Sequence, residues 1–100
     1  MHIRKTMENG ALTIALDGEL NTVTAPELGR AVEEDIDSAS SVTFDLAALE
    51  YISSAGLRVL LTTQQAMEER DLPTVMVKNL NDVIRATFEI TGFDNILNIL

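Results

Sequence analysis

The chain has 100 residues, 46% of them hydrophobic, and no cysteine. These values predict a single globular domain over residues 1–100 and exclude disulfides and thiolate metal sites. Sixteen acidic against seven basic residues give a net charge of −9, which argues against nucleic-acid binding because that function needs a basic surface. No stretch reaches the roughly 18 apolar residues of a membrane span, and the start lacks a signal-peptide core, so we expect a cytoplasmic protein without membrane insertion.

The first two predicted elements form a hairpin. Residues 2–7 and 11–17 are its strands, and in the second strand, "ALTIALDG", apolar residues alternate with polar or small ones. This alternation is typical of a strand with one buried face. Asn9 and Gly10 between the strands are a favoured pair for a tight hairpin turn.

The next stretch, "NTVTAPELGRAVEEDID", predicts a loop that leads into a helix. Thr24 is the expected N-cap, and Glu27 three residues later would complete a capping box. Pro26 falls in the first turn, where a missing N–H costs nothing. The residues that form the apolar helical stripe are Leu28, Ala31, Val32 and Ile36.

The second half of the chain alternates strands and helices. "SVTFDL", residues 41–46, predicts a central strand, and a helix follows from Ser53 to about Arg70, with a polar end, "QQAMEERD", that we expect to extend past the core. A strand in "LPTVMVKN", a third helix from the cap Asn81 to Gly92, and a last strand in "FDNILNIL" complete the chain. The order β-β-α-β-α-β-α-β predicts an α/β domain with a mixed, mostly parallel sheet.

Several kinds of chemistry find no support in the sequence. A serine-histidine-acid triad needs a histidine base, and the only histidine is His2, beside the terminus. Neither of the glycine-rich phosphate-loop patterns occurs. The acidic pairs Glu33-Glu34 and Glu68-Glu69 lie on predicted solvated helix faces. We therefore expect no enzyme activity, no cofactor and no metal.

Two adjacent serines begin the second predicted helix, in "EYISSAGLRVLL". Serine is favoured at an N-cap because its oxygen accepts a hydrogen bond from an unpaired backbone N–H, so capping alone is one interpretation of Ser53 and Ser54. The same helix start suits an anion, because it carries free N–H groups and the positive end of the dipole. In the second interpretation, phosphorylation adds about −1.5 to −2 charges while the fold persists, and Gly56 keeps the first turn open to a partner.

Three motifs in order carry a resemblance to a known family. The sequence resembles the STAS domain of bacterial anti-anti-sigma factors, also called anti-sigma factor antagonists, over nearly the whole chain. "LDGELNTVTAPEL" looks like the early motif of that family, a turn after the second strand followed by a helix start. "FDLAALEYISSAGLRVLL" looks like its central motif, and "ITGFDNILNI" resembles its late segment.

The resemblance implies a switch without catalysis. Members of the family bind an anti-sigma factor that is a serine kinase, are released when that kinase phosphorylates them, and are reset by a serine phosphatase. By the motif of the family the phosphoacceptor falls on Ser54, with Ser53 as the alternative. Leu57 either contacts the partner or packs in the core, and Arg58 either pairs with a partner carboxylate or lies in water. The expected binding surface comprises Asn21, Thr22, Ser53, Ser54, Gly56, Leu57 and Arg58.

Two positions depart from the pattern of the family. Members often carry an acid before the acceptor and at the end of the early motif, where this chain has Ser53 and Asn21. The lower negative charge would ease addition of a phosphate by reducing repulsion between like charges. It equally allows a different kinase, or none. The alternative function is an unswitched STAS module in a transporter or signalling assembly, in which Ser53 and Ser54 only cap the helix.

Overall fold

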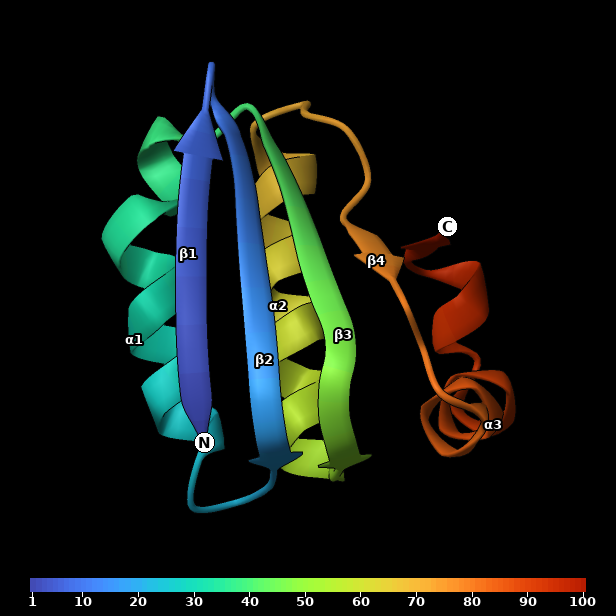
Figure 1. The fold of residues 1–100 in the computed structure, drawn as a ribbon. Helices are drawn as coiled ribbons and strands as arrows, with labels where there is room; N and C mark the ends of the chain where they lie inside the picture. Colours follow the sequence, from blue (N-terminus) through green and yellow to red (C-terminus); the bar gives the residue numbers. More distant parts are fainter.

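The computed structural model describes residues 1–100 as a sheet with helices packed against it (Figure 1). The predicted order of strands and helices is confirmed, with two added 3-10 turns, Ile36–Ser38 and Phe93–Asn95. No helix has both the length and the apolar composition needed to cross a membrane. The strands are β1 (His2–Glu8), β2 (Ala11–Leu20), β3 (Ser41–Ile52), β4 (Met76–Lys78) and β5 (Asn98–Ile99), and the helices are α1 (Ala25–Asp35), α2 (Ser54–Glu69) and α3 (Asp82–Thr91).

The sheet is mixed and mostly parallel, as predicted. Its five strands lie in the order β1-β2-β3-β4-β5. β1 is antiparallel to β2, and each later neighbour is parallel. Because parallel neighbours joined by right-handed crossovers carry their helices on one face of the sheet, the other face stays open. Figure 1 shows α1 and α2 together behind β1, β2 and β3.

Local signals fixed the hairpin and the third helix. Asn9 and Gly10 both have positive φ, 52° and 85°, which is the conformation of the tight turn that joins two twisted strands. At the start of α3 the Asn81 side chain accepts a hydrogen bond from Ile84 N–H over 2.8 Å. Gly92 ends this helix with a left-handed φ of 80°. These three predictions are confirmed.

The central strand is longer than the sequence predicts. The alternation of buried and half-buried residues that starts at Ser41 breaks at Ala47 and Ala48, which are both exposed. A shift in the β2–β3 pairing lies at this point, and such a bulge adds a residue without ending the strand. β3 therefore continues to Ile52 and leads directly into α2.

The expectation that the polar end of α2 extends past the core is wrong. Gln64 and Met67 are both buried. The Gln64 side chain accepts a hydrogen bond from Val75 N–H over 2.7 Å and donates one to Glu68 over 2.9 Å. Because its polar atoms are paired, the glutamine is buried at little cost. It ties α2 to the segment that enters β4.

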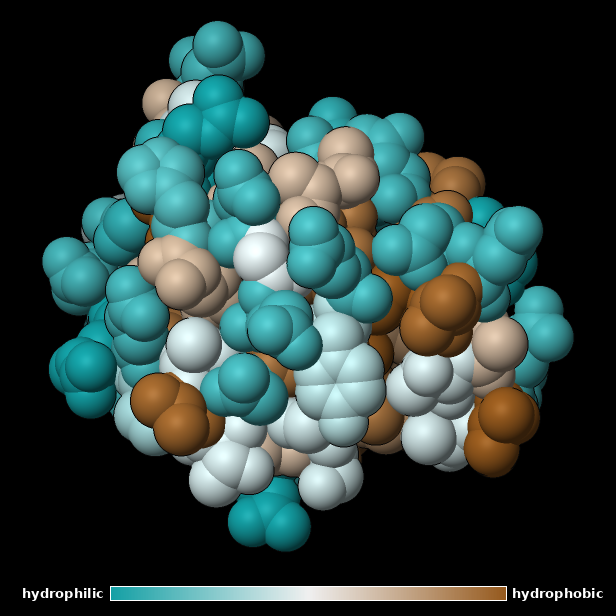
Figure 2. Space-filling view, turned by 60° about the horizontal axis from the view of Figure 1, so that its bottom comes forward, coloured by the Kyte–Doolittle hydropathy of each residue, from teal (hydrophilic) through white to brown (hydrophobic).

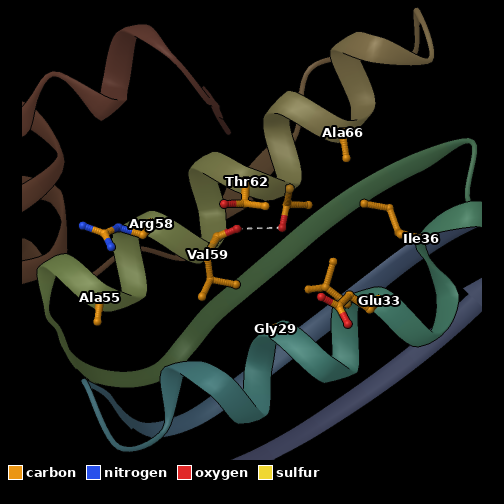
Figure 3. Close-up of a pocket in the computed structure, with 10 residues that line it drawn as sticks. Gly29, Glu33, Ile36, Ala55, Arg58, Val59, Thr62 and Ala66 are labelled. Atoms are coloured by element: carbon orange, nitrogen blue, oxygen red, sulfur yellow. Dashed lines mark hydrogen bonds between the residues drawn. The ribbon is translucent and has the colours of Figure 1, made fainter.

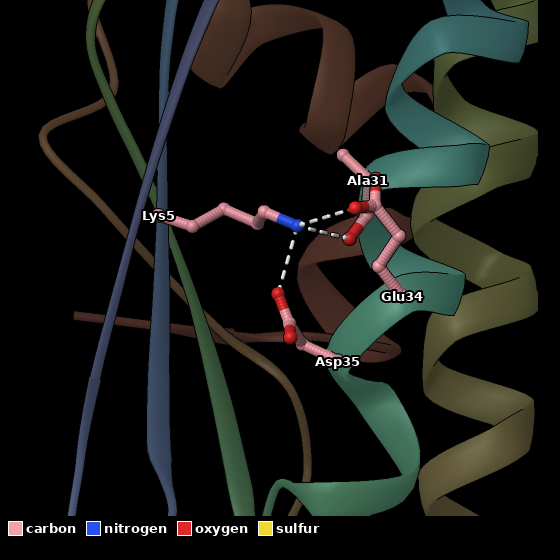
Figure 4. Close-up of polar contacts among 4 residues, drawn as sticks. All are labelled: Lys5, Ala31, Glu34 and Asp35. Atoms are coloured by element: carbon pink, nitrogen blue, oxygen red, sulfur yellow. Dashed lines mark hydrogen bonds and ion pairs between the residues drawn. The ribbon is translucent and has the colours of Figure 1, made fainter.

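Lys5 on the edge strand β1 binds the end of α1 (Figure 4). Its Nζ donates a hydrogen bond to the Ala31 carbonyl over 3.0 Å. It also lies 2.7 Å from an Asp35 carboxylate oxygen and 3.8 Å from one of Glu34. The last turn of α1 contains no basic residue, so Lys5 supplies the positive charge that a helix C-terminus favours.

Replacing Lys5 with methionine is expected to lower the free energy of unfolding by about 1 kcal/mol at low salt. The substitution keeps the apolar stem but leaves the acidic end of α1 without its cation. Urea unfolding of both proteins at low and high salt measures the loss, which should shrink as salt rises. Arg85→Met, at an exposed position of α3, is the control and should change stability by less than about 0.5 kcal/mol. Equal effects of the two substitutions would contradict the role of Lys5.

The carboxylate of Asp45, on β3, has a pKa below its ordinary value. Its Oδ1 accepts hydrogen bonds from the Asn79 amide over 2.9 Å and from Ala47 N–H over 3.1 Å. The bond from Asn79 acts most strongly, and with the Ala47 N–H and the charges of Lys78 and Arg4 it holds the pKa of Asp45 below 3.8, although partial burial opposes this. These groups share the open face of the sheet.

Asp45→Asn is expected to lower the free energy of unfolding by about 0.5–1 kcal/mol near neutral pH, a modest loss because much of the side chain is in water. A lowered pKa stabilises the fold at pH values above the ordinary 3.8, and this contribution is lost as the pH falls through the lowered value. The difference between the two proteins should therefore shrink in acid. Urea unfolding across pH measures it, with the exposed Asp17→Asn as control. A difference independent of pH would contradict this assignment.

Candidate functional site

The start of α2 and the loop after β2 lie at the same end of the sheet. Leu20 pairs with Ile52 at the ends of the two parallel strands, and Ser53 N–H donates a hydrogen bond to the Leu20 carbonyl over 2.9 Å. Asn21 and Ser54 follow directly on either side of this junction. In Figure 1 this end of β2 and β3 is at the bottom. The structure thus brings the two predicted segments of the site together.

Ser53 is the N-cap of α2. Its backbone is extended, with φ −96° and ψ 175°, and its hydroxyl accepts a hydrogen bond from Gly56 N–H over 3.4 Å. The Ser53 carbonyl accepts the first bond of the helix, from Leu57 N–H over 3.0 Å. Of the two serines that could cap the helix, Ser53 is therefore the one that does so.

Ser54 is the first residue of α2, and it is exposed. Because Ser53 supplies the cap, the Ser54 hydroxyl is not required for it. The first turn contains no acidic residue, so its free N–H groups and positive dipole end are not already neutralised. A phosphate on Ser54 would meet favourable rather than repulsive local charge.

Gly56 and Leu57 face the core. A Cβ on Gly56 would lie 2.6 Å from Leu20 Cγ and 3.0 Å from Ile52 Cγ1, so the glycine lets α2 approach the sheet closely. The expectation that it opens the turn to a partner is therefore wrong. Leu57 is only 6% exposed, which makes core packing the correct one of the two roles predicted for it.

Arg58 is exposed one turn after Ser54. Figure 3 shows its guanidinium pointing outward beside Ala55. Both ion pairs of the domain are made by Lys5, so Arg58 has no carboxylate partner within the protein. It lies on the same face of α2 as Ser54, because residues four apart are neighbours on a helix.

The loop after β2 is ordered by its own side chains. Asn21 Oδ1 accepts hydrogen bonds from the N–H groups of Val23 and Thr24 over 3.0 and 3.1 Å. The Thr24 hydroxyl accepts from Asn21 N–H and donates to the Glu19 carbonyl, each over 2.9 Å. Thr24 is the N-cap of α1, as predicted, but its side chain makes no bond to the helix, so the predicted capping box is wrong. Thr22, at the tip of the loop, is exposed.

The family is decided by a match over almost the whole chain. The model of the STAS domain matches residues 2–100. The chain belongs to the STAS domain family. The resemblance found in the three sequence motifs is thereby confirmed, and the sheet and helix order of this STAS domain agrees with it.

Two relatives carry informative names. A protein of Bordetella bronchiseptica named as a candidate anti-sigma factor antagonist, BtrV, is 35% identical over 86 residues, which are 85% of this STAS domain and 73% of the relative. The anti-sigma-F factor antagonist RsfB of Mycobacterium tuberculosis is 28% identical over 87 residues, 86% of this chain and 70% of the relative.

The fold matches a solved anti-sigma factor antagonist in two states. The Bacillus protein SpoIIAA superposes with a TM-score of 0.79 in its unphosphorylated form, at 15% identity, with 99% of this chain and 87% of that chain covered. Its phosphorylated form gives 0.78 at 16% identity, with 99% and 91% covered. These likenesses show that this chain has the fold that SpoIIAA has in both forms.

Two exposed apolar residues at the same end of the sheet as Ser54 are not predicted from the sequence. Val23, in the loop after β2, is 85% exposed, and Tyr51, near the end of β3, is 47% exposed. Val23 is the single apolar residue of the polar stretch "NTVT", and from this its exposure could have been predicted. Figure 2, with this end of the STAS domain turned forward, shows pale and brown residues interspersed with teal ones.

Proposed function

We propose that this STAS domain is an anti-sigma factor antagonist that is switched by phosphorylation of Ser54. In the unmodified state it binds an anti-sigma factor, and this partner is a serine kinase. Phosphorylation of Ser54 by that kinase releases the domain, and a serine phosphatase restores binding. The names of two relatives support the antagonist function.

The observation that carries the proposal is that one serine caps the helix while the other is exposed. Ser53 holds the helix start through its hydroxyl, while Ser54 presents its hydroxyl at the surface. A kinase can therefore modify Ser54 without removing the cap. The phosphate adds about −1.5 to −2 charges at the centre of the proposed binding surface, so the partner faces a changed charge on an unchanged fold.

The surroundings of Ser54 favour phosphate addition. Asn21 and Ser53 are neutral, and both contribute their side chains to local hydrogen bonds. With no carboxylate at either position, the approaching phosphate meets less repulsion. Thr22, Val23 and Arg58 are exposed at the same end of the domain, and we propose that they complete the contact with the anti-sigma factor.

Mass spectrometry after incubation with ATP and each kinase-like protein encoded beside the gene tests the proposal. We expect a single phosphate on Ser54 in the wild type, none in Ser54→Ala, and an unchanged site in Ser53→Ala. Full modification of the Ser54→Ala protein at Ser53 would show that Ser53, and not Ser54, is the phosphoacceptor. No modification by any of the kinases would overturn the switch and favour an unswitched STAS module.

A further inference from the structure

An apolar groove lies between α1 and α2 (Figure 3), and Ala55, which follows Ser54 in the first turn of α2, is one of the residues that line it. Its volume is about 260 Å³. Apolar or small residues line it on both sides: Gly29 and Val32 from α1 and Ile36 from the 3-10 turn after it, and Ala55, Val59 and Ala66 from α2.

The groove exists because small residues face one another across the two helices. A Cβ on Gly29 would have no atom within 4 Å, so the glycine is not required by internal packing. Ala55 and Ala66 on the facing helix are equally short. Val59 and Ile36 remain half-buried, which leaves apolar surface that the domain itself does not cover.

The two rims of the groove carry opposite charges that are not used within the protein. Glu33 lines the α1 side and Arg58 the α2 side. Both ion pairs of the domain are made by Lys5, so neither rim residue has an ionic partner. At the far end Arg70 bridges to the carbonyls of Ile36 and Asp37 over 2.6 and 3.1 Å, which joins the two helices there.

We propose that this groove receives an amphipathic helix of the anti-sigma factor. The α2 wall from Ala55 to Ala66 is about 16 Å long at 1.5 Å per residue, which matches three turns of a helix that places apolar side chains in the groove. A carboxylate of that helix pairs with Arg58, and a lysine or arginine pairs with Glu33. The inference rests on the proposed function, since it specifies the contact made by that partner.

This contact links the groove to the switch. Arg58 lies one turn from Ser54, within reach of a phosphate there. Once Ser54 is phosphorylated, its phosphate pairs with the guanidinium and repels the carboxylate of the bound helix. The same modification thus adds charge at the start of α2 and removes the ionic anchor of the groove.

Calorimetric titration with the purified anti-sigma factor kinase that modifies Ser54 tests the groove. Gly29→Leu fills it and should weaken binding at least about tenfold, as expected for a central apolar contact. Gly29→Ala leaves the groove open and, like Gly29→Leu, replaces glycine with a residue that favours a helix. It should bind within about twofold of the wild type. Glu33→Lys should weaken binding about fivefold, whereas Glu89→Lys on α3 should not.

Three results would contradict the inference. If all four variants bind like the wild type while Ser54→Asp does not bind, the groove is not the binding site and the proposed function stands. If the wild type binds no anti-sigma factor, both fail. If the chain alone dimerises and Gly29→Leu abolishes the dimer, the groove holds a second copy instead. Should Gly29→Leu fail to fold by circular dichroism, Glu33→Lys against Glu89→Lys decides.

Discussion

Replacing Gly56 with alanine is expected to destabilise the domain by about 1–3 kcal/mol, the usual cost of overpacking a core. The new Cβ would lie 2.6 Å from Leu20 Cγ, 2.8 Å from Leu20 Cδ2 and 3.0 Å from Ile52 Cγ1. Leu20 is fully buried, so a shift of its side chain would have to displace neighbouring core residues. Alanine also has a helical preference of up to about 1 kcal/mol over glycine, but this gain is smaller than the steric cost.

Urea unfolding of Gly56→Ala measures this cost, and Gly29→Ala provides the matched control. Gly29 is also a helical glycine, but its Cβ would meet nothing within 4 Å, so alanine there should raise stability by about 0.5–1 kcal/mol. The two substitutions are chemically identical and should have opposite signs. A Gly56→Ala protein as stable as the wild type would show that Leu20 repacks freely, contrary to the close approach of α2 to β2.

Ser54→Asp is expected to weaken binding to the anti-sigma factor about 100-fold, since an unpaired charge buried at an interface costs about 3 kcal/mol. The carboxylate places a negative charge on the surface that the partner covers. The fold should not suffer, because an acid in the first turn of a helix is stabilising by about 0.3–1 kcal/mol. Calorimetric titration measures the affinity, and urea unfolding measures the stability.

Ser54→Asn separates charge from shape in this experiment. Its side chain has nearly the size of aspartate but no charge, so it should bind within about fivefold of the wild type. Equal weakening by Asn and Asp would mean that the space around Ser54, rather than its charge, controls release. Loss of stability in Ser54→Asp would show that Ser54 and not Ser53 holds the helix start, against the cap bond from Gly56 N–H.

The elements that the sequence predicted well depend on neighbours along the chain. The Asn9-Gly10 turn, the Asn81 cap and the Gly92 end are local, because each needs only the backbone preferences of a few consecutive residues. The alternation of strands and helices then restricts the sheet to a mixed, mostly parallel one. The role of Ser53 as cap was predictable for the same reason.

The wrong expectations concern contacts that the residue pattern of a single helix or strand does not contain. Thr24 is the N-cap of α1, but its hydroxyl bonds to the Glu19 carbonyl and the Asn21 N–H instead of the helix. Gln64 lies in the polar end of the predicted helix, but its side chain is buried because it accepts a hydrogen bond from Val75 N–H over 2.7 Å. The predicted central strand is too short because the bulge at Ala47 and Ala48 interrupts the alternation on which strand prediction depends.

By itself the sequence determined the STAS fold, the pair of serines at a helix start and the excess of negative charge, since these follow from residue type and order. Only the tertiary structure decided which of the neighbouring residues reach the surface. Gly56 and Leu57 are turned inward by the packing of α2 on Leu20 and Ile52, while Ser54 and Arg58 are turned outward. The groove between α1 and α2 likewise arises from the spacing of two helices, which no single segment of the chain encodes.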